Sequence, residues 1–196
     1  MSRYSDHDVY LDPVSGVLRN RFGVEDAAEL EGLEARIVAA RSRELVKGPV
    51  KGRYDLAHLQ AIHRYLFGDL YEWAGQLRTV DISKNGHMFA HRAHIAGAAG
   101  EIFHKLEGEK YLAGLGPDAF CLRAAYYFGE INALHPFREG NGRTQREFLS
   151  HLADAAGYYI AWEDVVYAEM LRASIESFLG NLSGLSAIIK NCLRAR

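Results

Sequence analysis

The stretch that most constrains how this chain folds is residues 135–146, His-Pro-Phe-Arg-Glu-Gly-Asn-Gly-Arg-Thr-Gln-Arg. Pro136 cannot continue a helix, and it biases the residue before it away from helical angles. Upstream, apolar side chains recur at the steps of one helix face, namely Phe120, Ala124, Tyr127, Phe128, Ile131 and Leu134. Downstream, the same period restarts at Phe148, and Gly157 is a helix-end signal. The sequence therefore predicts a helix that closes at His135, a short loop, and a second helix that the two glycines open.

The loop and the start of the second helix suit the phosphates of a nucleoside triphosphate. A helix start presents unpaired backbone N–H groups and the positive end of the helix dipole, and the glycines of Gly140-Asn141-Gly142 let phosphate oxygens approach closely. Arg143 and Arg146 lie three residues apart, so we expect both to project from the same side of the first turn. There they would neutralise two phosphate groups.

Two neighbouring residues add chemistry to this phosphate site. The carboxylate of Glu139 could hold Mg2+ against the phosphates, and His135 is the one group in the stretch that accepts a proton near neutral pH. Taken singly, each feature has a commoner explanation: a histidine that interacts with a helix dipole, a glycine turn, a helix-start acid, two solvated arginines. Their occurrence together in this order favours a nucleotide site beside a base.

The stretch resembles the signature of the Fic (filamentation induced by cAMP) family, His-Pro-Phe-x-Asp/Glu-Gly-Asn-Gly-Arg-x-x-Arg, and it fills every defined position. The resemblance extends from about Tyr10 to the C-terminal helix, and it is strongest to the short toxins of bacterial toxin–antitoxin pairs, the VbhT-like branch. It implies the all-α Fic fold, a bundle of about six to eight helices with one small β-hairpin over the active site. It also implies transfer of AMP from Mg-ATP to a hydroxyl side chain of a target protein.

The resemblance assigns roles to residues of the motif. His135 is the catalytic base, Glu139 holds Mg2+, and the nucleotide-binding set is completed by Gly140, Asn141, Gly142, Arg143 and Arg146. Phe137 has no chemistry of its own, and we expect it to anchor the loop in the core.

The hairpin expected from the family falls on residues 77–91, where Asn85-Gly86 is a strong two-residue hairpin signal. In Fic proteins the corresponding hairpin is a flap that holds the target segment by strand addition. The resemblance places that role on Ile82, Ser83, Lys84 and Asn85.

The rest of the chain is predicted to complete a single domain over residues 1–196. Residues 1–24 form an extended arm, and further helices are expected at 25–47, from an N-cap at Asp55, at 93–110, at 163–178 and at 183–194. Residues 158–162 are expected to be a short apolar connection.

An absent motif suggests how the activity is controlled. Fic enzymes are often inhibited by a helix with Ser/Thr-x-x-x-Glu-Gly/Asn, whose Glu pairs with the second motif arginine, here Arg146. No serine or threonine of this chain has Glu four residues later. The resemblance therefore implies a separate small antitoxin protein that supplies the Glu to Arg146. It also points to the ATPase subunits of DNA gyrase and topoisomerase IV as targets.

Charge and hydropathy limit the other partners. The net charge of −2 gives no general attraction to nucleic acid or to an anionic membrane, and no apolar run approaches a membrane span. The first residues do not form a secretion signal, so we expect a cytoplasmic protein, with export by specialised machinery left open.

Three alternatives stay open at this point. On the same fold, the transferred group could be the terminal phosphate, as in Doc-like proteins, or another nucleotide; Doc-like kinases depart from the Gly-Asn-Gly pattern that this chain keeps. A non-catalytic module could use the helix start to dock a phosphorylated partner. A metal-dependent hydrolase could use His87, His91 and His94, although the Asn85-Gly86 turn directs His87 elsewhere and no fourth ligand is near.

Overall fold

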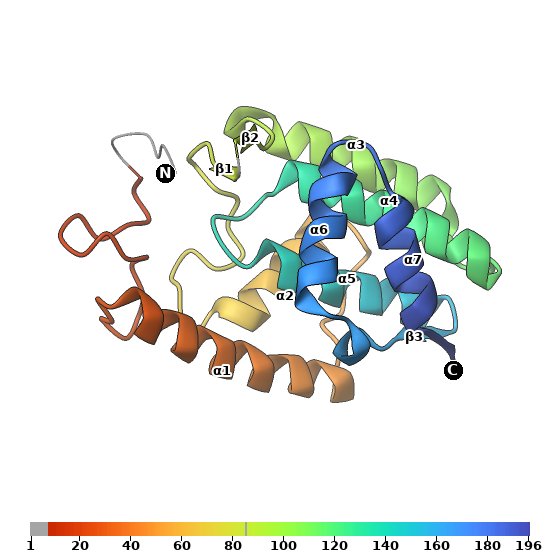
Figure 1. Ribbon diagram of the computed structural model, residues 1–196, viewed down its shortest axis with the longest axis horizontal. Helices are drawn as coiled ribbons and strands as arrows, with labels where there is room; N and C mark the ends of the chain where they lie inside the picture. Colours follow the sequence, from red (N-terminus) through yellow and green to blue (C-terminus); the bar gives the residue numbers. More distant parts are fainter. Residues whose placement is uncertain (1–7, 85) are drawn as a thin grey trace.

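The computed structural model describes residues 8–84 and 86–196. Within these residues the chain forms seven α-helices, which confirms the predicted all-α class and the expected number of helices (Figure 1). They are α1 (Ala27–Lys47), α2 (Leu56–Phe67), α3 (Ile95–Gly108), α4 (Pro117–Leu134), α5 (Asn141–Ala155), α6 (Tyr167–Phe178) and α7 (Ser183–Cys192).

Helix α4 is the centre of the bundle. It packs against α3, α5, α6 and α7, while α2 packs against α1, α3 and α5. The face of α4 predicted from its periodicity is buried along its whole length, from Phe120 to Leu134. In Figure 1, α1 (orange) runs along one edge of the molecule, and α3 (yellow-green) lies toward the opposite edge. The motif loop that follows α4 is therefore held from several sides by helices.

Helix α2 starts at its predicted capping residue, and α1 starts at a capping residue that was not predicted. Asp55 caps α2, where its side chain accepts a hydrogen bond from the His58 N–H, and Asp26 caps α1 in the same way through the Glu29 N–H. The third helix begins later than expected, because Arg92–His94 forms a 3-10 turn before α3. Helix α6 also begins later than residue 163, because Val165 and Val166 are extended after another 3-10 turn.

The hairpin forms where the sequence predicts it. Strand β1 (Ser83–Lys84) pairs antiparallel with β2 (His87–Met88) in the register Ser83↔Met88 and Lys84↔His87. This register leaves a two-residue turn, in which Gly86 has a φ of 81°.

The prediction of one hairpin as the only β-structure is wrong. Residues expected to be a connection form β3 (Tyr158–Ile160), which pairs antiparallel with β4 (Leu193–Ala195) at the end of the chain. The last predicted helix therefore ends at Cys192 and gives way to a strand. Gly157, with a φ of 83°, redirects the chain after α5 and lets these segments, distant in sequence, lie side by side.

The described part of the N-terminal arm lies on the body, as predicted; residues 1–7 of that arm fall outside the described residues. Tyr10 and Val17 are buried, and Leu11 and Leu18 form an isolated β-bridge. Asp8 accepts a hydrogen bond from Arg138 Nε at 2.8 Å, so the arm contacts the motif loop itself.

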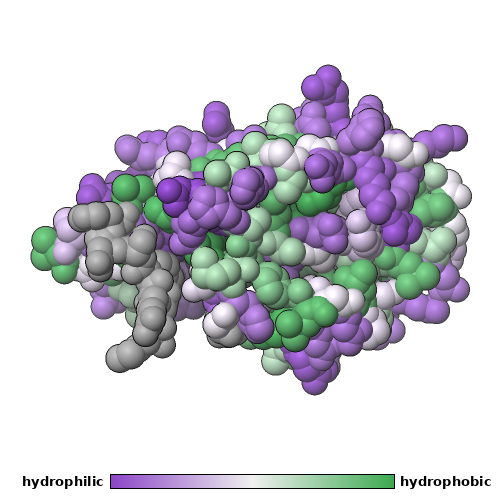
Figure 2. All heavy atoms as spheres, turned by 90° about the horizontal axis from the view of Figure 1, so that it is seen from above, coloured by the Kyte–Doolittle hydropathy of each residue, from purple (hydrophilic) through white to green (hydrophobic). Residues whose placement is uncertain are grey.

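The surface is mixed in character. Polar side chains cover much of the face in Figure 2, with apolar residues between them. Across the described residues, none of the helices has the length and apolar character needed to cross a membrane.

Candidate active site

The flap, the motif loop and α6 enclose a cavity of about 860 Å³. The flap contributes Ile82, Ser83, Lys84, Gly86, His87 and Phe89 to its lining. The end of α4, the loop and the start of α5 contribute Asn132, His135, Arg138, Glu139, Asn141, Gly142 and Arg146. Helix α6 contributes Tyr167, Met170, Leu171, Ser174, Ile175 and Phe178. Most of the predicted site residues therefore meet at one cavity.

His135 closes α4, as predicted, with a left-handed backbone (φ 46°, ψ 62°). Its Nδ1 lies 3.3 Å from the Asn132 carbonyl oxygen, so Nδ1 carries the proton and donates, which leaves Nε2 as the proton acceptor. The ring stacks on Phe89 with 3.8 Å between the ring centroids. Burial, reinforced by the cations Arg78 and Lys84, lowers the pKa of His135 to about 3. The imidazole is therefore neutral at pH 7, with an unprotonated Nε2.

The motif loop is anchored in the core through Phe137. The Phe137 side chain is buried and stacks on His63 of α2, with 3.9 Å between the centroids. Asn141 closes the loop from within: its Oδ1 accepts from the Phe137 N–H at 2.9 Å, and its Nδ2 donates to the Phe137 carbonyl at 2.8 Å. Asn141 lines the cavity, but its side chain holds the loop in shape.

His63 ties the loop to α2. Its Nδ1 accepts from the Gly75 N–H at 2.8 Å, so Nε2 carries the proton and donates to the Glu139 carbonyl at 2.9 Å. Burial lowers the pKa of His63 to about 4, opposed by the hydrogen bond to Glu139.

Gly140 is required twice over at the start of α5. Its φ of 79° is left-handed, and a Cβ there would lie 2.4 Å from the Phe67 ring. The first bond of α5 runs from the Thr144 N–H to the Gly140 carbonyl, so the N–H groups of Asn141, Gly142 and Arg143 have no partner within the helix. The cavity thus meets a helix start suited to bind phosphate oxygens.

The two motif arginines do not face the same side, and that prediction is wrong. Arg146 lines the cavity, whereas the Arg143 guanidinium donates to Glu34 of α1 at 2.5 Å and lies 4.9 Å from the centroid of Phe67. A three-residue step leaves about 60° between side chains on a helix, and long side chains amplify that divergence. The buried carboxylate of Glu34 draws Arg143 toward α1.

Glu139 presents a carboxylate to the cavity. Its side chain is 46% exposed, one oxygen accepts from the Gly140 N–H at 2.8 Å, and the same oxygen lies 3.5 Å from Arg143 Nη2. Arg143 therefore contacts the site indirectly, by way of the Glu139 carboxylate. The free oxygen and the solvent access suit a magnesium ion, which takes one or two carboxylates together with phosphate oxygens.

Three of the four predicted target-holding residues belong to the same cavity. Ile82, Ser83 and Lys84 line it, and Asn85 falls outside the described residues.

Of the three flap-side histidines, His91 and His94 lie together, with 5.6 Å between their ring centroids, and His87 packs elsewhere. His91 lies 3.2 Å from Asp81, and His87 packs on the Phe178 ring. Among the residues that the structure describes, no cluster of three or more His, Cys, Asp or Glu is arranged to hold a metal. The hydrolase alternative therefore gains no support from these histidines.

Sequence reasoning missed several residues of the site. The individual residues of the wall supplied by α6 were not assigned, and Phe89, Glu34 and Arg78 were given no roles. Arg78 interrupts an otherwise strand-like stretch, which was the one signal available. Its partners are backbone carbonyls, which leave no trace in a sequence.

Comparisons with known proteins agree with this geometry. A model of the Fic/DOC family matches residues 53–153. The chain is 49% identical over 194 residues to the protein adenylyltransferase VbhT of Bartonella schoenbuchensis, covering 98% of this chain and 41% of that protein. It is 41% identical over 187 residues to the probable protein adenylyltransferase Fic of Salmonella typhimurium, covering 95% of this chain and 92% of that protein.

Solved structures share the fold over nearly the whole chain. The BepC protein of Bartonella tribocorum, with bound AMPPNP, has a TM-score of 0.91 at 26% identity and covers 96% of this chain and 97% of that chain. A Fic domain from Bartonella quintana with bound ADP has a TM-score of 0.90 at 28% identity and covers 96% of this chain and 95% of that chain. The family match over more than half of the chain and the close relative of similar length lead to one conclusion: this chain belongs to the Fic/DOC family.

Proposed function

We propose that this chain is a protein adenylyltransferase, which transfers AMP from Mg-ATP to a hydroxyl side chain of a target protein. The observation that carries the proposal is a neutral His135, with Nε2 available, in the same cavity as the start of α5, Glu139 and Arg146. Relatives named adenylyltransferases, and related structures with bound AMPPNP or ADP, support the same reaction.

The start of α5 binds the triphosphate. Asn141 and Gly142 line the cavity with N–H groups that have no partner within the helix, and Arg146 adds a positive charge for the phosphates. The apolar side chains of α6, among them Leu171 and Ile175, complete a wall suited to a base.

Glu139 is the residue that would hold Mg2+. When bound, the ion neutralises charge on the phosphates. Arg143 and the Gly140 N–H keep the carboxylate in place, so Arg143 acts as a support for Glu139.

His135 acts on the attacking hydroxyl. The target oxygen forms a bond to the α-phosphorus while its proton moves to Nε2, and the bond from the α-phosphorus to the bridging oxygen breaks to release pyrophosphate. Arg146 stabilises the charge that develops on the pyrophosphate. The products are an AMP phosphodiester on the target, and pyrophosphate.

Two parallel labelling reactions test the transferred group. We expect a protein band in cell lysate to acquire label from α-labelled ATP and none from γ-labelled ATP. A phosphate-sized adduct by mass spectrometry would instead establish the Doc-like reaction.

A base variant tests the catalytic role. We expect His135→Ala to lower the labelling rate by about 10²–10⁴-fold, the usual contribution of a general base, while AMPPNP still binds in calorimetry. His104→Ala serves as the control, because its side chain is 88% exposed and far from the motif in sequence. Equal labelling by His135→Ala and wild type would exclude the base role of His135.

We further propose that the protein is the toxin of a toxin–antitoxin pair. Arg146, which faces the cavity, is accessible to a Glu supplied by an antitoxin helix, and this ion pair would remove its charge from ATP. The proposed targets are the ATPase subunits of DNA gyrase and topoisomerase IV, and the labelled band from lysate, identified by mass spectrometry, tests them directly.

A further inference from the structure

A buried arginine, Arg78, stands at the start of the flap segment, contacts the motif loop and takes no direct part in the proposed reaction. Its side chain is 0% exposed. Its guanidinium donates to the carbonyl oxygens of His135 at 2.8 Å, of Val80 at 2.8 Å, of Leu134 at 3.4 Å, and of Ala90. Its own backbone N–H donates to the Pro136 carbonyl at 2.9 Å. One side chain thus joins both ends of the flap to the end of α4.

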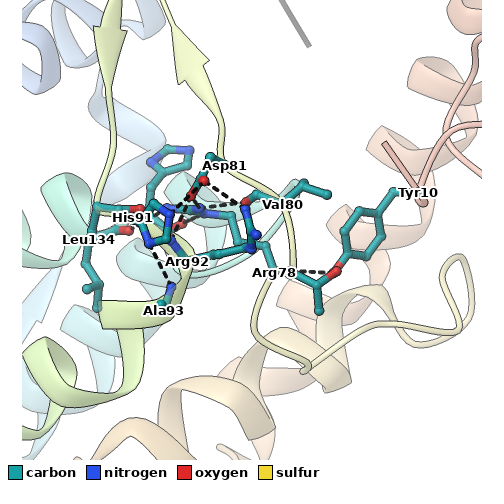
Figure 3. A network of polar contacts seen from close by, with 11 residues as sticks. Tyr10, Arg78, Val80, Asp81, His91, Arg92, Ala93 and Leu134 are labelled. Atoms are coloured by element: carbon teal, nitrogen blue, oxygen red, sulfur yellow. Dashed lines mark hydrogen bonds and ion pairs between the residues drawn. The ribbon is translucent and has the colours of Figure 1, made fainter. Parts of the chain in front are cut away.

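The positive charge of Arg78 is stabilised mainly by the dipoles of these carbonyl groups. The nearest carboxylate, Asp81, lies 3.8 Å away and also contacts His91 and Arg92 (Figure 3). The carbonyls at the end of α4 carry the negative end of the helix dipole, which favours a cation there. Only the planar fork of arginine has donors enough, in fixed directions, for carbonyls of separate segments.

The hydrogen bond of Arg78 to Ala90 also affects the position of the His135 imidazole. Ala90, whose carbonyl Arg78 binds, also donates its N–H to the Ala133 carbonyl at 3.2 Å. The preceding residue, Phe89, stacks on His135 with 16° between the ring planes. Arg78 therefore holds the backbone of His135 directly, and it holds the His135 ring through the segment after β2 that carries Phe89.

We propose that Arg78 is a positioning residue for AMP transfer: it fixes the flap at a set distance from His135, so that a target segment bound along the flap presents its hydroxyl to Nε2. This inference rests on the proposed function. The cavity residues that would bind the nucleotide, at the start of α5 and on α6, do not include Arg78. Loss of Arg78 should therefore slow transfer and spare nucleotide affinity.

The test compares Arg78→Met and Arg78→Lys with Arg92→Met. Arg92 is the matched control, because it contacts the same Asp81 at 2.9 Å but is 50% exposed. We expect AMPPNP affinity by calorimetry to stay within about threefold in all variants, and transfer from α-labelled ATP to fall about 100-fold in Arg78→Met, the cost of a small misplacement. Arg78→Lys, with its single nitrogen, should recover about a tenth of the rate or less, and Arg92→Met should stay within about twofold of wild type.

A second readout, independent of activity, follows His135 by NMR. Stacking on Phe89 shifts the imidazole ring protons of wild type, and both Arg78 variants should lose this shift while Arg92→Met keeps it. An Arg78 variant with an unchanged shift and rate would overturn the proposal, and so would affinity that falls in parallel with rate. If Arg78→Met does not fold, Arg78→Lys decides both readouts. If wild type transfers no AMP, the proposed function fails, and the ring shift still decides whether Arg78 positions His135.

Discussion

His135 and Gly140 are the two residues of the motif loop with a left-handed backbone, at φ of 46° and 79°. A residue with a Cβ loses about 1–2 kcal/mol in this conformation. At His135 the conformation is held by Pro136, which prevents the helix from continuing, and by Arg78, which binds the His135 carbonyl. At Gly140 the absence of a Cβ is itself the requirement, because Phe67 occupies the space that a Cβ would need.

Alanine substitutions at Gly140 and at Gly142 test whether Gly140 requires the absence of a Cβ. Gly140→Ala should lower the free energy of unfolding by about 3 kcal/mol, because it combines left-handed strain with overpacking against Phe67. Gly142→Ala is the control: a Cβ there has no neighbour closer than 3.8 Å, and alanine favours the helix by about 0.5–1 kcal/mol. Chemical denaturation of both variants measures the difference, and equal stabilities would contradict the assignment.

Among the secondary-structure elements, α1 has an unexpected link to the motif. It lies outside residues 53–153 that the family model matches, yet its Glu34, only 10% exposed, accepts from Arg143 at 2.5 Å. The other carboxylate oxygen accepts from the Tyr71 hydroxyl. Burial and this bond raise the pKa of Tyr71. Helix α1 thus sets the direction of the first motif arginine and, through Arg143, steadies Glu139.

Replacing this carboxylate should weaken the link. Glu34→Gln leaves Arg143 opposite a neutral amide, so we expect the free energy of unfolding to fall by about 1–3 kcal/mol. Glu31→Gln, on an exposed position of the same helix, should change it by less than about 0.5 kcal/mol. Urea unfolding of both variants provides the measurement; similar losses would show that the buried pair contributes nothing specific.

For the whole molecule, three histidines with lowered pKa values make stability depend on pH: the buried His58 and His63 and the partly buried His135. Burial is the largest cause that lowers the pKa of His58, of His63 to about 4, and of His135 to about 3. In the folded chain His63 and His135 stay neutral until the pH approaches their lowered pKa values, while an unfolded histidine takes up a proton below about pH 6.5. The unfolded state thus binds more protons in this range, so stability is complete above about pH 7 and falls as the pH decreases toward 4.

Denaturant titrations between pH 7.5 and pH 5 measure this loss of unfolding free energy. The range is chosen because most carboxylates become protonated only at lower pH. For His63 alone, the change from pH 7 to pH 4 corresponds to about 3 kcal/mol. His63→Gln should flatten the dependence of unfolding free energy on pH, whatever its effect on stability at pH 7.5. A wild type whose stability is constant from pH 7.5 to pH 5 would contradict the neutral burial of these histidines.

The sequence by itself determined the features that depend on neighbours along the chain. The buried face of α4, the cap at Asp55, the turn beside Gly86 and the order of helix, loop and helix around His135 all follow from spacing and turn chemistry within a few residues. These signals are local, so they survive in the sequence.

The tertiary structure alone decided the contacts between distant segments. Three contacts join parts of the chain that are far apart in sequence. They are the pairing of β3 with β4, the ion pair of Arg143 with Glu34, and the hydrogen bonds of Arg78 to the backbone carbonyls around it. No periodicity encodes such partners, and backbone carbonyls are common to every residue. These contacts form only when the packed helices bring the segments together. A buried charge or an unpaired strand edge then needs a hydrogen-bond partner, and the neighbouring segment supplies it.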